Sequence, residues 1–226
     1  ALDIGLLASL GIAQVTVVRR LRVAILTTGD ELLPAGAAPE PGKIYDSNRP
    51  LLNALLTRMP VDLIDLGIIA DDPSALRKAF NTAMQWADVV ISTGGVSVGD
   101  ADYTKTILAE LGAIDFWKIA MRPGRPMAVG RIQKGQRSAV LFGLPGNPVA
   151  VMVTFLAFVK PALLKMMGST ATPLPMLRAR TAALKQRIIV IFIAILGPRQ
   201  CAVFGRGIDQ IARIVERMSR AQHRGK

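Results

Sequence analysis

The sequence of 226 residues contains one cysteine, Cys201, and one histidine, His223, and both lie near the C-terminus. A single cysteine excludes a disulfide within the chain. With so few of these ligands, a zinc site built from clustered Cys and His side chains is also excluded, as is a Ser-His-Asp triad in the body of the chain. Any chemistry there must use carboxylates, lysines, arginines, hydroxyls and backbone amides.

Aromatic residues are also scarce, at 5% of the sequence, whereas 51% of the residues are hydrophobic. This balance favours an aliphatic α/β interior over an all-β sandwich. The apolar run 188–196 has only about half the length of a membrane-spanning helix, and the first residues lack the pattern of a secretory signal. We therefore expect a cytoplasmic protein with no membrane partner.

The net charge of +12 comes mainly from one end of the chain. Residues 1–170 carry 17 basic and 14 acidic side chains, whereas residues 171–226 carry 11 and 2. A basic protein is a candidate for nucleic-acid binding, but the nearly neutral body makes nucleic acid an unexpected partner. Binding through the tail would instead weaken steeply with salt and vanish when residues 177–226 are deleted.

Apolar, β-branched runs alternate with segments of helical spacing along most of the chain. Strands are predicted at 22–28, 61–66 and 88–92, extended segments at 114–121, 127–131 and 139–142, and helices at about 48–58, 73–86, 103–111 and 149–167. This alternation predicts a three-layer α/β fold, with a mostly parallel sheet and helices on both faces. Because ligands of such sheets bind at the carboxyl ends of the strands, we expect the site there.

Two of the loops at these strand ends are acidic. Asp30 and Glu31 follow the first predicted strand in the segment TTGDEL, and Asp71 and Asp72 follow the second. Each acid could be a turn or capping residue, and Asp72 before Pro73 is the clearest candidate for a helix cap. The alternative is that some of these carboxylates hold a hard cation such as Mg²⁺, which prefers oxygen ligands.

The loop after the third predicted strand, in STGGVSVGDADY, is rich in glycine. Gly94 and Gly95 could turn backbone N–H groups toward a phosphate, with Ser97 nearby, although a plain tight turn is the alternative. Asp100 and Asp102 would repel a phosphate unless a cation lay between them. This loop therefore also implies Mg²⁺.

Two further segments lie directly before helices. In IYDSNR, the hydroxyl of Ser47, the amide of Asn48 and the guanidinium of Arg49 could form an anion seat at a helix N-terminus. Asp46, Ser47 and Asn48 are therefore candidate substrate-binding residues, although all three are ordinary capping residues. Pro145 and Pro148 in GLPGNP stiffen a loop that aims the first amides of the next helix. An inert rigid turn is the alternative for this second segment.

A basic hairpin is predicted in the segment FWKIAMRPGRP. Lys118, Arg122 and Arg125 lie close together in it, and its two prolines stiffen the turn. Fixed cations of this kind suit an oxyanion such as phosphate or molybdate. A solvated basic hairpin is the alternative.

Taken together, these motifs resemble a known family. TTGDEL, IYDSN, GIIADD, STGGVSVGDADYTK, FWKIAMRPGRP and GLPGNP occur in this order, and with similar spacing, in the molybdopterin molybdenumtransferases (MoeA) and the gephyrin E domain. The resemblance covers about residues 4–178, and the pair GGVSVG and GLPGNP is its most specific part. It implies a molybdopterin adenylyltransferase-like fold and an enzyme of molybdenum cofactor biosynthesis.

The resemblance also implies a reaction, a metal and partners. Enzymes of the family combine adenylylated molybdopterin with molybdate and release AMP, using a divalent cation that we expect to be magnesium. They form homodimers, and other proteins of molybdenum cofactor biosynthesis are further expected partners. The acids that match the family's catalytic and metal-binding positions are Glu31, Asp71 and Asp102. The residues that match the positions for the anionic substrate and the molybdate loop are Lys118, Arg122, Pro145 and Pro148.

The sequence departs from the family in two ways. Residue 150 is alanine, where relatives often carry a serine after GNPV. Full enzymes also have further N-terminal domains and a C-terminal β domain. We therefore interpret residues 1–20 as the remnant of a preceding domain or linker, 21–170 as the catalytic domain, and 171–226 as an atypical basic tail. A chain of this kind could be inactive.

Two other functions fit the same fold. A molybdopterin adenylyltransferase would consume ATP, and the GLPGNP loop argues against it. A non-catalytic module would bind pterin or a protein partner and would keep that binding in an Asp102→Ala variant, whereas an enzyme would lose turnover.

Overall fold

The computed structural model describes residues 2–95, 103–118, 124 and 126–170. Its strands are β1 (Leu21–Thr28), β2 (Leu32–Leu33), β3 (Ile44–Tyr45), β4 (Val61–Ile69), β5 (Val89–Thr93), β6 (Gly112–Lys118), β7 (Pro126–Lys134) and β8 (Arg137–Leu144). Its helices are α1 (Leu2–Ser9), α2 (Asn48–Leu56), α3 (Pro73–Trp86), α4 (Tyr103–Leu111), α5 (Pro148–Thr154) and α6 (Lys160–Met166), and a π-helical turn (Phe155–Val159) joins the last two.

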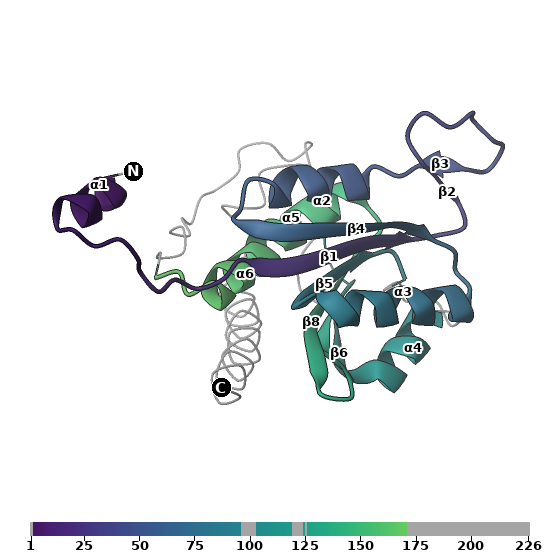
Figure 1. Cartoon of the computed structure of the whole chain (residues 1–226). Helices are drawn as coiled ribbons and strands as arrows, with labels where there is room; N and C mark the ends of the chain where they lie inside the picture. Colours follow the sequence, from purple (N-terminus) through teal and green to yellow (C-terminus); the bar gives the residue numbers. More distant parts are fainter. Residues whose placement is uncertain (1, 96–102, 119–123, 125, 171–226) are drawn as a thin grey trace, which may run out of the picture.

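Six of the strands form one sheet in the order β4-β1-β5-β8-β7-β6 (Figure 1). β4, β1, β5 and β8 run parallel to one another, whereas β7 is antiparallel to both of its neighbours. The prediction of a mostly parallel sheet is therefore confirmed.

Helices cover both faces of this sheet, which confirms the predicted layers (Figure 1). On one face, Val23 of β1 belongs to the same buried cluster as Leu52 of α2 and residues of α5 and α6. On the other face, Ala24 belongs to a second cluster with Phe80 of α3 and Leu108 of α4. Because β1 is buried on both faces, its sequence is a continuous apolar run and not an alternating one.

The chain connections bring several strand ends to one place. The chain passes from β1 through α2 to β4, and from β4 through α3 to β5, on the far side of β1. The helices that follow neighbouring strands therefore lie on opposite faces of the sheet. Connections that diverge in this way leave a crevice at the carboxyl ends of the strands.

Two features of the fold differ from the prediction. The segment after β1 contains the short parallel pair β2 and β3, which at two residues each carries no recognisable sequence pattern. β4 also continues to Ile69, beyond its predicted end at Leu66. Its pairing with β1 shifts register between Ile25 and Thr27, and this bulge lets the strand run on to Ile69 and deliver Asp71 to the sheet edge.

The apolar stretch Pro148–Met166 is a core helix. By length and composition alone it could cross a membrane, but 56% of it is buried inside the protein. Val151, Phe155 and Leu163 are buried in the cluster that packs on the sheet. The sheet therefore covers the apolar side that a lipid would otherwise contact.

The N-terminal segment lies apart from the sheet (Figure 1). α1 has no buried residue, and the side chains of Leu2 and Ile4 are 91% and 73% exposed. The division of the chain at residues 20 and 170 stays a prediction, and residues 171–226 lie outside the described part.

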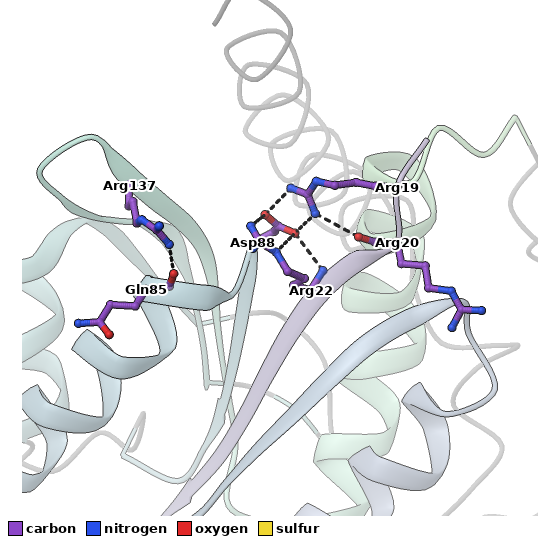
Figure 2. A network of polar contacts seen from close by, with 6 residues as sticks. All are labelled: Arg19, Arg20, Arg22, Gln85, Asp88 and Arg137. Carbon is purple, nitrogen blue, oxygen red and sulfur yellow. Dashed lines mark hydrogen bonds and ion pairs between the residues drawn. The ribbon is translucent and has the colours of Figure 1, made fainter. Parts of the chain in front are cut away.

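An ion-pair cluster holds the amino end of the sheet, away from the strand-end crevice (Figure 2). Asp88, buried just before β5, accepts hydrogen bonds from Arg19 Nη1 at 2.6 Å, Arg19 Nη2 at 2.7 Å and the backbone N–H of Arg22 at 2.9 Å. Burial by itself raises the pKa of Asp88, but the hydrogen bonds from Arg19 and Arg22 outweigh it, and the pKa lies below its ordinary value. The cluster ties the segment before β1 to β5.

We expect Asp88→Asn to lower the free energy of unfolding at pH 7 by about 1–3 kcal/mol, because the amide cannot accept all of these charged hydrogen bonds. The folded pKa is lowered, so the carboxylate's contribution is complete above about pH 4 and is lost as the pH falls through that folded pKa. Urea unfolding should show that the difference in free energy of unfolding between wild type and variant becomes smaller toward pH 2.5. A difference in free energy of unfolding that does not change with pH would contradict this account.

Asp62→Asn is the matched control. Asp62 lies 3.9 Å from Arg20 and both side chains are at least half exposed, so its loss should change stability by less than about 0.5 kcal/mol.

Candidate functional site

A cavity of about 260 Å³ opens at the carboxyl end of the sheet. Its walls come from the turns after β1, β4, β5 and β8 and from the start of β7. The lining residues are Thr28, Gly29, Glu31, Asp71, Gly94, Gly95, Pro126, Pro145 and Gly146. Glycines, acids and a proline that the sequence had placed in separate loops thus meet at one edge.

The turn after β1 contributes an acid that folds back over a glycine. A Cβ atom on Gly29 would lie 2.6 Å from Oε2 of Glu31, so a larger residue could not occupy this position without moving that carboxylate. Gly29 also has a φ of 149°, which side chains rarely tolerate. The glycine therefore allows Glu31 to lie against the backbone at the cavity.

The neighbouring acid joins two of the loops. The backbone N–H of Asp71 donates to Oδ1 of Asp30 at 3.0 Å, and Nζ of Lys43 donates to the carbonyl oxygen of Asp30. Asp30 therefore fixes the loop after β4 to the loop after β1. Asp71 is the member of this pair that lines the cavity.

The glycine turn after β5 approaches β1 closely. Gly94 has a φ of 82°, and a Cβ atom there would lie 2.3 Å from the carbonyl oxygen of Thr28 and 2.9 Å from its hydroxyl. Gly94 and Gly95 line the cavity, as their predicted place at a strand end requires. Ser97 and Asp102, predicted in the same loop, lie outside the described residues.

The loop after β8 forms another wall through Pro145 and Gly146. Asn147 caps the next helix, because its Oδ1 accepts from the N–H groups of Val149 at 3.0 Å and Ala150 at 3.2 Å. Pro148 is the first residue of α5 and is not among the lining residues. Of the two predicted prolines, Pro145 is thus the one at the cavity.

The predicted anion seat at 46–48 does not line the cavity. Asp46 is buried and accepts from Thr27 Oγ1 at 2.9 Å and from the N–H groups of Asn48 and Arg49 at 3.0 and 3.1 Å. Nδ2 of Asn48 donates to the carbonyl oxygen of Gly146 at 2.6 Å. Ser47 is exposed and makes no side-chain cap hydrogen bond. The Asp46 carboxylate and the Asn48 Nδ2 group are thus directed to the protein, and the role of all three residues toward a substrate stays a prediction.

The basic residues are described only in part. Lys118 is the last residue of β6 and its backbone pairs with Pro126, which lines the cavity. Arg122 lies outside the described residues. The strand pairing therefore brings the backbone of Lys118 beside the site.

Thr28, Gly29, Pro126 and Gly146 line the cavity and were not singled out beforehand. The hydroxyl of Thr28 is buried and makes no hydrogen bond in the part of the chain that the structure describes. The signal that could have found Thr28 is its place as the last residue of a predicted strand. Pro126 could not be found in this way, because it begins a strand that runs antiparallel to β8.

The donor set at the cavity suits a hard cation. Glu31 and Asp71 supply carboxylates from two different loops, and Mg²⁺ prefers such oxygen ligands. Within residues 2–95, 103–118, 124 and 126–170, no three His, Cys, Asp or Glu side chains gather at one place. The third predicted ligand, Asp102, falls outside these ranges, so the metal site stays a prediction.

Comparison with known protein families and with named proteins points to one family. A family described as "Probable molybdopterin binding domain" matches residues 24–165. Two proteins named molybdopterin molybdenumtransferase are similar to the chain: one from Haemophilus influenzae, 46% identical over 166 residues, and one from Bacillus subtilis, 43% identical over 160 residues. The matches cover 74% and 70% of this chain, but only 40% and 36% of those proteins.

Solved structures agree with the fold. A molybdopterin biosynthesis MoeA protein from Pyrococcus horikoshii is 34% identical with a TM-score of 0.63, covering 74% of this chain and 40% of that one. The tungsten cofactor synthesizing protein MoaB from Pyrococcus furiosus, at 22% identity and a TM-score of 0.52, matches over 66% of this chain and 96% of its own. At that identity the second likeness shows the fold alone.

The close approach of Gly94 to Thr28 leads to a stability prediction. We expect Gly94→Ala to lower the free energy of unfolding by more than about 2 kcal/mol, because both the positive φ and the contact with a backbone oxygen are unfavourable. Gly36→Ala is the matched control: Gly36 has a φ of 88° but open space around its Cβ position. It should cost only about 1–2 kcal/mol. Equal losses in urea unfolding would show that the contact with Thr28 contributes nothing.

Proposed function

The chain belongs to the family described as probable molybdopterin-binding domains, and on that premise we propose that it inserts molybdate into adenylylated molybdopterin and releases AMP. The observation that carries the proposal is the cavity at the carboxyl end of the sheet, where a glycine turn, two acids and a proline loop meet. The names of its relatives, which are molybdopterin molybdenumtransferases, support the same activity. The chain spans about 40% of the length of these relatives.

The glycine turn is suited to the phosphoanhydride of the substrate. Gly94 and Gly95 carry no side chains, so a phosphate can approach their backbone closely. Lys118 and Arg122 would add positive charge from the neighbouring hairpin, and Ser97 a hydroxyl. Together these groups would hold a dianion without a histidine, which the body of the chain lacks.

Glu31 and Asp71, together with Asp102, would hold a magnesium ion at the cavity. When bound, the ion would neutralise the negative charge of the phosphoanhydride oxygens. The protein's own groups would orient the linkage: Pro145 limits the loop after β8 to few conformations, and Asp30 keeps the loop of Asp71 beside that of Glu31. Catalysis would then rest on positioning and electrostatic stabilisation.

We further propose that the protein is a cytoplasmic homodimer. It would interact with other proteins of molybdenum cofactor biosynthesis. The exposed apolar side chains of the segment 2–18 support association with another protein surface. The apolar helix 148–166 packs against the sheet through its buried residues, and 56% of it is buried.

The proposal is tested by AMP release. The full chain would be incubated with adenylylated molybdopterin, and AMP would be followed by chromatography with and without molybdate and Mg²⁺. We expect release that needs both. Consumption of ATP with unadenylylated molybdopterin would identify an adenylyltransferase instead, and pterin binding without any AMP release would identify a non-catalytic module.

We expect Asp71→Asn and Glu31→Gln each to weaken Mg²⁺-dependent turnover by at least about tenfold, since even the partners of metal ligands are worth roughly 10–100-fold. Glu40→Gln is the control, because Glu40 is an exposed acid that does not line the cavity. In a magnesium titration, the Mg²⁺ concentration for half-maximal turnover should be higher for the two variants than for the wild type. It should be unchanged for the control. Unchanged titrations would remove these acids from the metal site.

A further inference from the structure

Asn48 connects the start of α2 to the loop after β8. Its side chain is buried, with 6% of the residue exposed, and its Nδ2 lies 2.6 Å from the carbonyl oxygen of Gly146. The two residues are 98 positions apart in the sequence. This hydrogen bond therefore joins two of the strand-end loops directly.

The Asn48 end of this connection is rigid. The Asp46 carboxylate, whose side chain is 1% exposed, accepts from Thr27 Oγ1 of β1 and from the backbone N–H of Asn48. Arg49 also donates from Nε to Asp46 and from Nη1 to Asp65 of β4. The backbone of Asn48 is thus fixed to the two parallel strands β1 and β4.

At the other end of this connection, Gly146 is the residue of the loop whose own conformation is least restricted, because its neighbours Pro145 and Asn147 are limited by a proline ring and by the cap of α5. Gly146 is exposed and a Cβ atom there would meet nothing within 4 Å. Glycine also has the widest choice of backbone angles. The prolines at 145 and 148 lack an N–H, so the loop between them has only the donors of Gly146 and Asn147. A side-chain hydrogen bond from outside the loop is therefore well placed to set its conformation.

The orientation of one peptide unit follows from this hydrogen bond. In a trans peptide the C=O and N–H groups point in opposite directions. With the carbonyl of Gly146 turned to Asn48, the N–H of Asn147 points away from α2. Rotation of this peptide would turn the N–H of Asn147 toward α2 and the carbonyl group of Gly146, which lines the cavity, away from it.

The Asn48 side chain does not improve stability as much as its burial suggests. Its Oδ1 is buried and makes no hydrogen bond within the described part of the chain. An unsatisfied buried acceptor costs about as much as the hydrogen bond of Nδ2 contributes. Removing the whole amide should therefore leave global stability nearly unchanged while it frees the loop.

We infer that Asn48 is a positioning residue, which orients the Gly146–Asn147 peptide at the cavity wall so that the loop presents a donor to an oxyanion. The inference rests on the proposed function for the identity of that anion, and molybdate is the probe. It assigns Asn48 an indirect role, acting through Gly146, in place of the direct contact predicted for the IYDSN segment.

The test compares Asn48→Ala with Asn53→Ala in the full chain. Asn53 lies later in the same helix, α2, is only partly buried and does not line the cavity. We expect Asn48→Ala to speed amide hydrogen exchange of Asn147 and Val149 by about three- to tenfold, and to raise the Kd for molybdate by a similar factor. The melting temperature should change by less than about 3 °C. Asn53→Ala should leave amide exchange and the Kd for molybdate unchanged.

Several outcomes would overturn the inference. Unchanged amide exchange in Asn48→Ala would show that the hydrogen bond does not hold the loop, and a raised Kd for molybdate without that change would favour direct anion binding by Asn48. A large fall in melting temperature, repeated in Asn48→Ser, would make Asn48 a structural residue only. If the wild-type chain binds no molybdate and releases no AMP while the loop still loosens in Asn48→Ala, the proposed function fails and the loop positioning stands.

Discussion

The site depends on the close approach of two neighbouring strand ends. Where β1 ends at Thr28, the turn after β5 passes so near that only a glycine fits at position 94. This contact fixes the position of the turn after β5 relative to the turn after β1. Residues of both turns line the cavity. Every other wall is placed with respect to this pair, because β1 and β5 are the central strands to which β4 and β8 are added.

Hydrogen bonds between loops divide the polar residues into two groups. Asp30, Asp46 and Asn48 hold one loop to another, while Glu31 and Asp71 line the cavity. A carboxylate that accepts several N–H or O–H groups has few lone pairs left for a ligand. Asp46, which accepts from Thr27, Asn48 and Arg49, therefore has few lone pairs left for a ligand.

The ion-pair cluster of Asp88 and the candidate site lie at opposite ends of the sheet. At the amino end, Asp88 is surrounded by Arg19 and Arg22 in a satisfied cluster (Figure 2). At the carboxyl end, the hydroxyl of Thr28 is buried without a hydrogen bond among the described residues. Unsatisfied buried polar groups cost stability, and their place beside the cavity is consistent with a site that is completed by a ligand.

The sequence by itself determined the layers, the order of the elements and the helix cap at Asp72, which accepts from the N–H of Ala75 at 2.8 Å. Each of these follows from local patterns: apolar runs for strands buried on both faces, helical spacing for the layers that cover them, and an acid before Pro73. It also placed Glu31, Asp71 and the glycine pair at strand ends, because parallel strands share one carboxyl edge.

Only the tertiary structure decided which polar residues line the cavity. Asp46 and Asn48 looked like ligands for an anion, but their partners are Thr27 and Gly146, which lie far away in the sequence. Pro126 became a lining residue through strand pairing that no local pattern encodes. A residue's chemistry is set by its type, but its role depends on which donors and acceptors the fold brings within hydrogen-bonding distance.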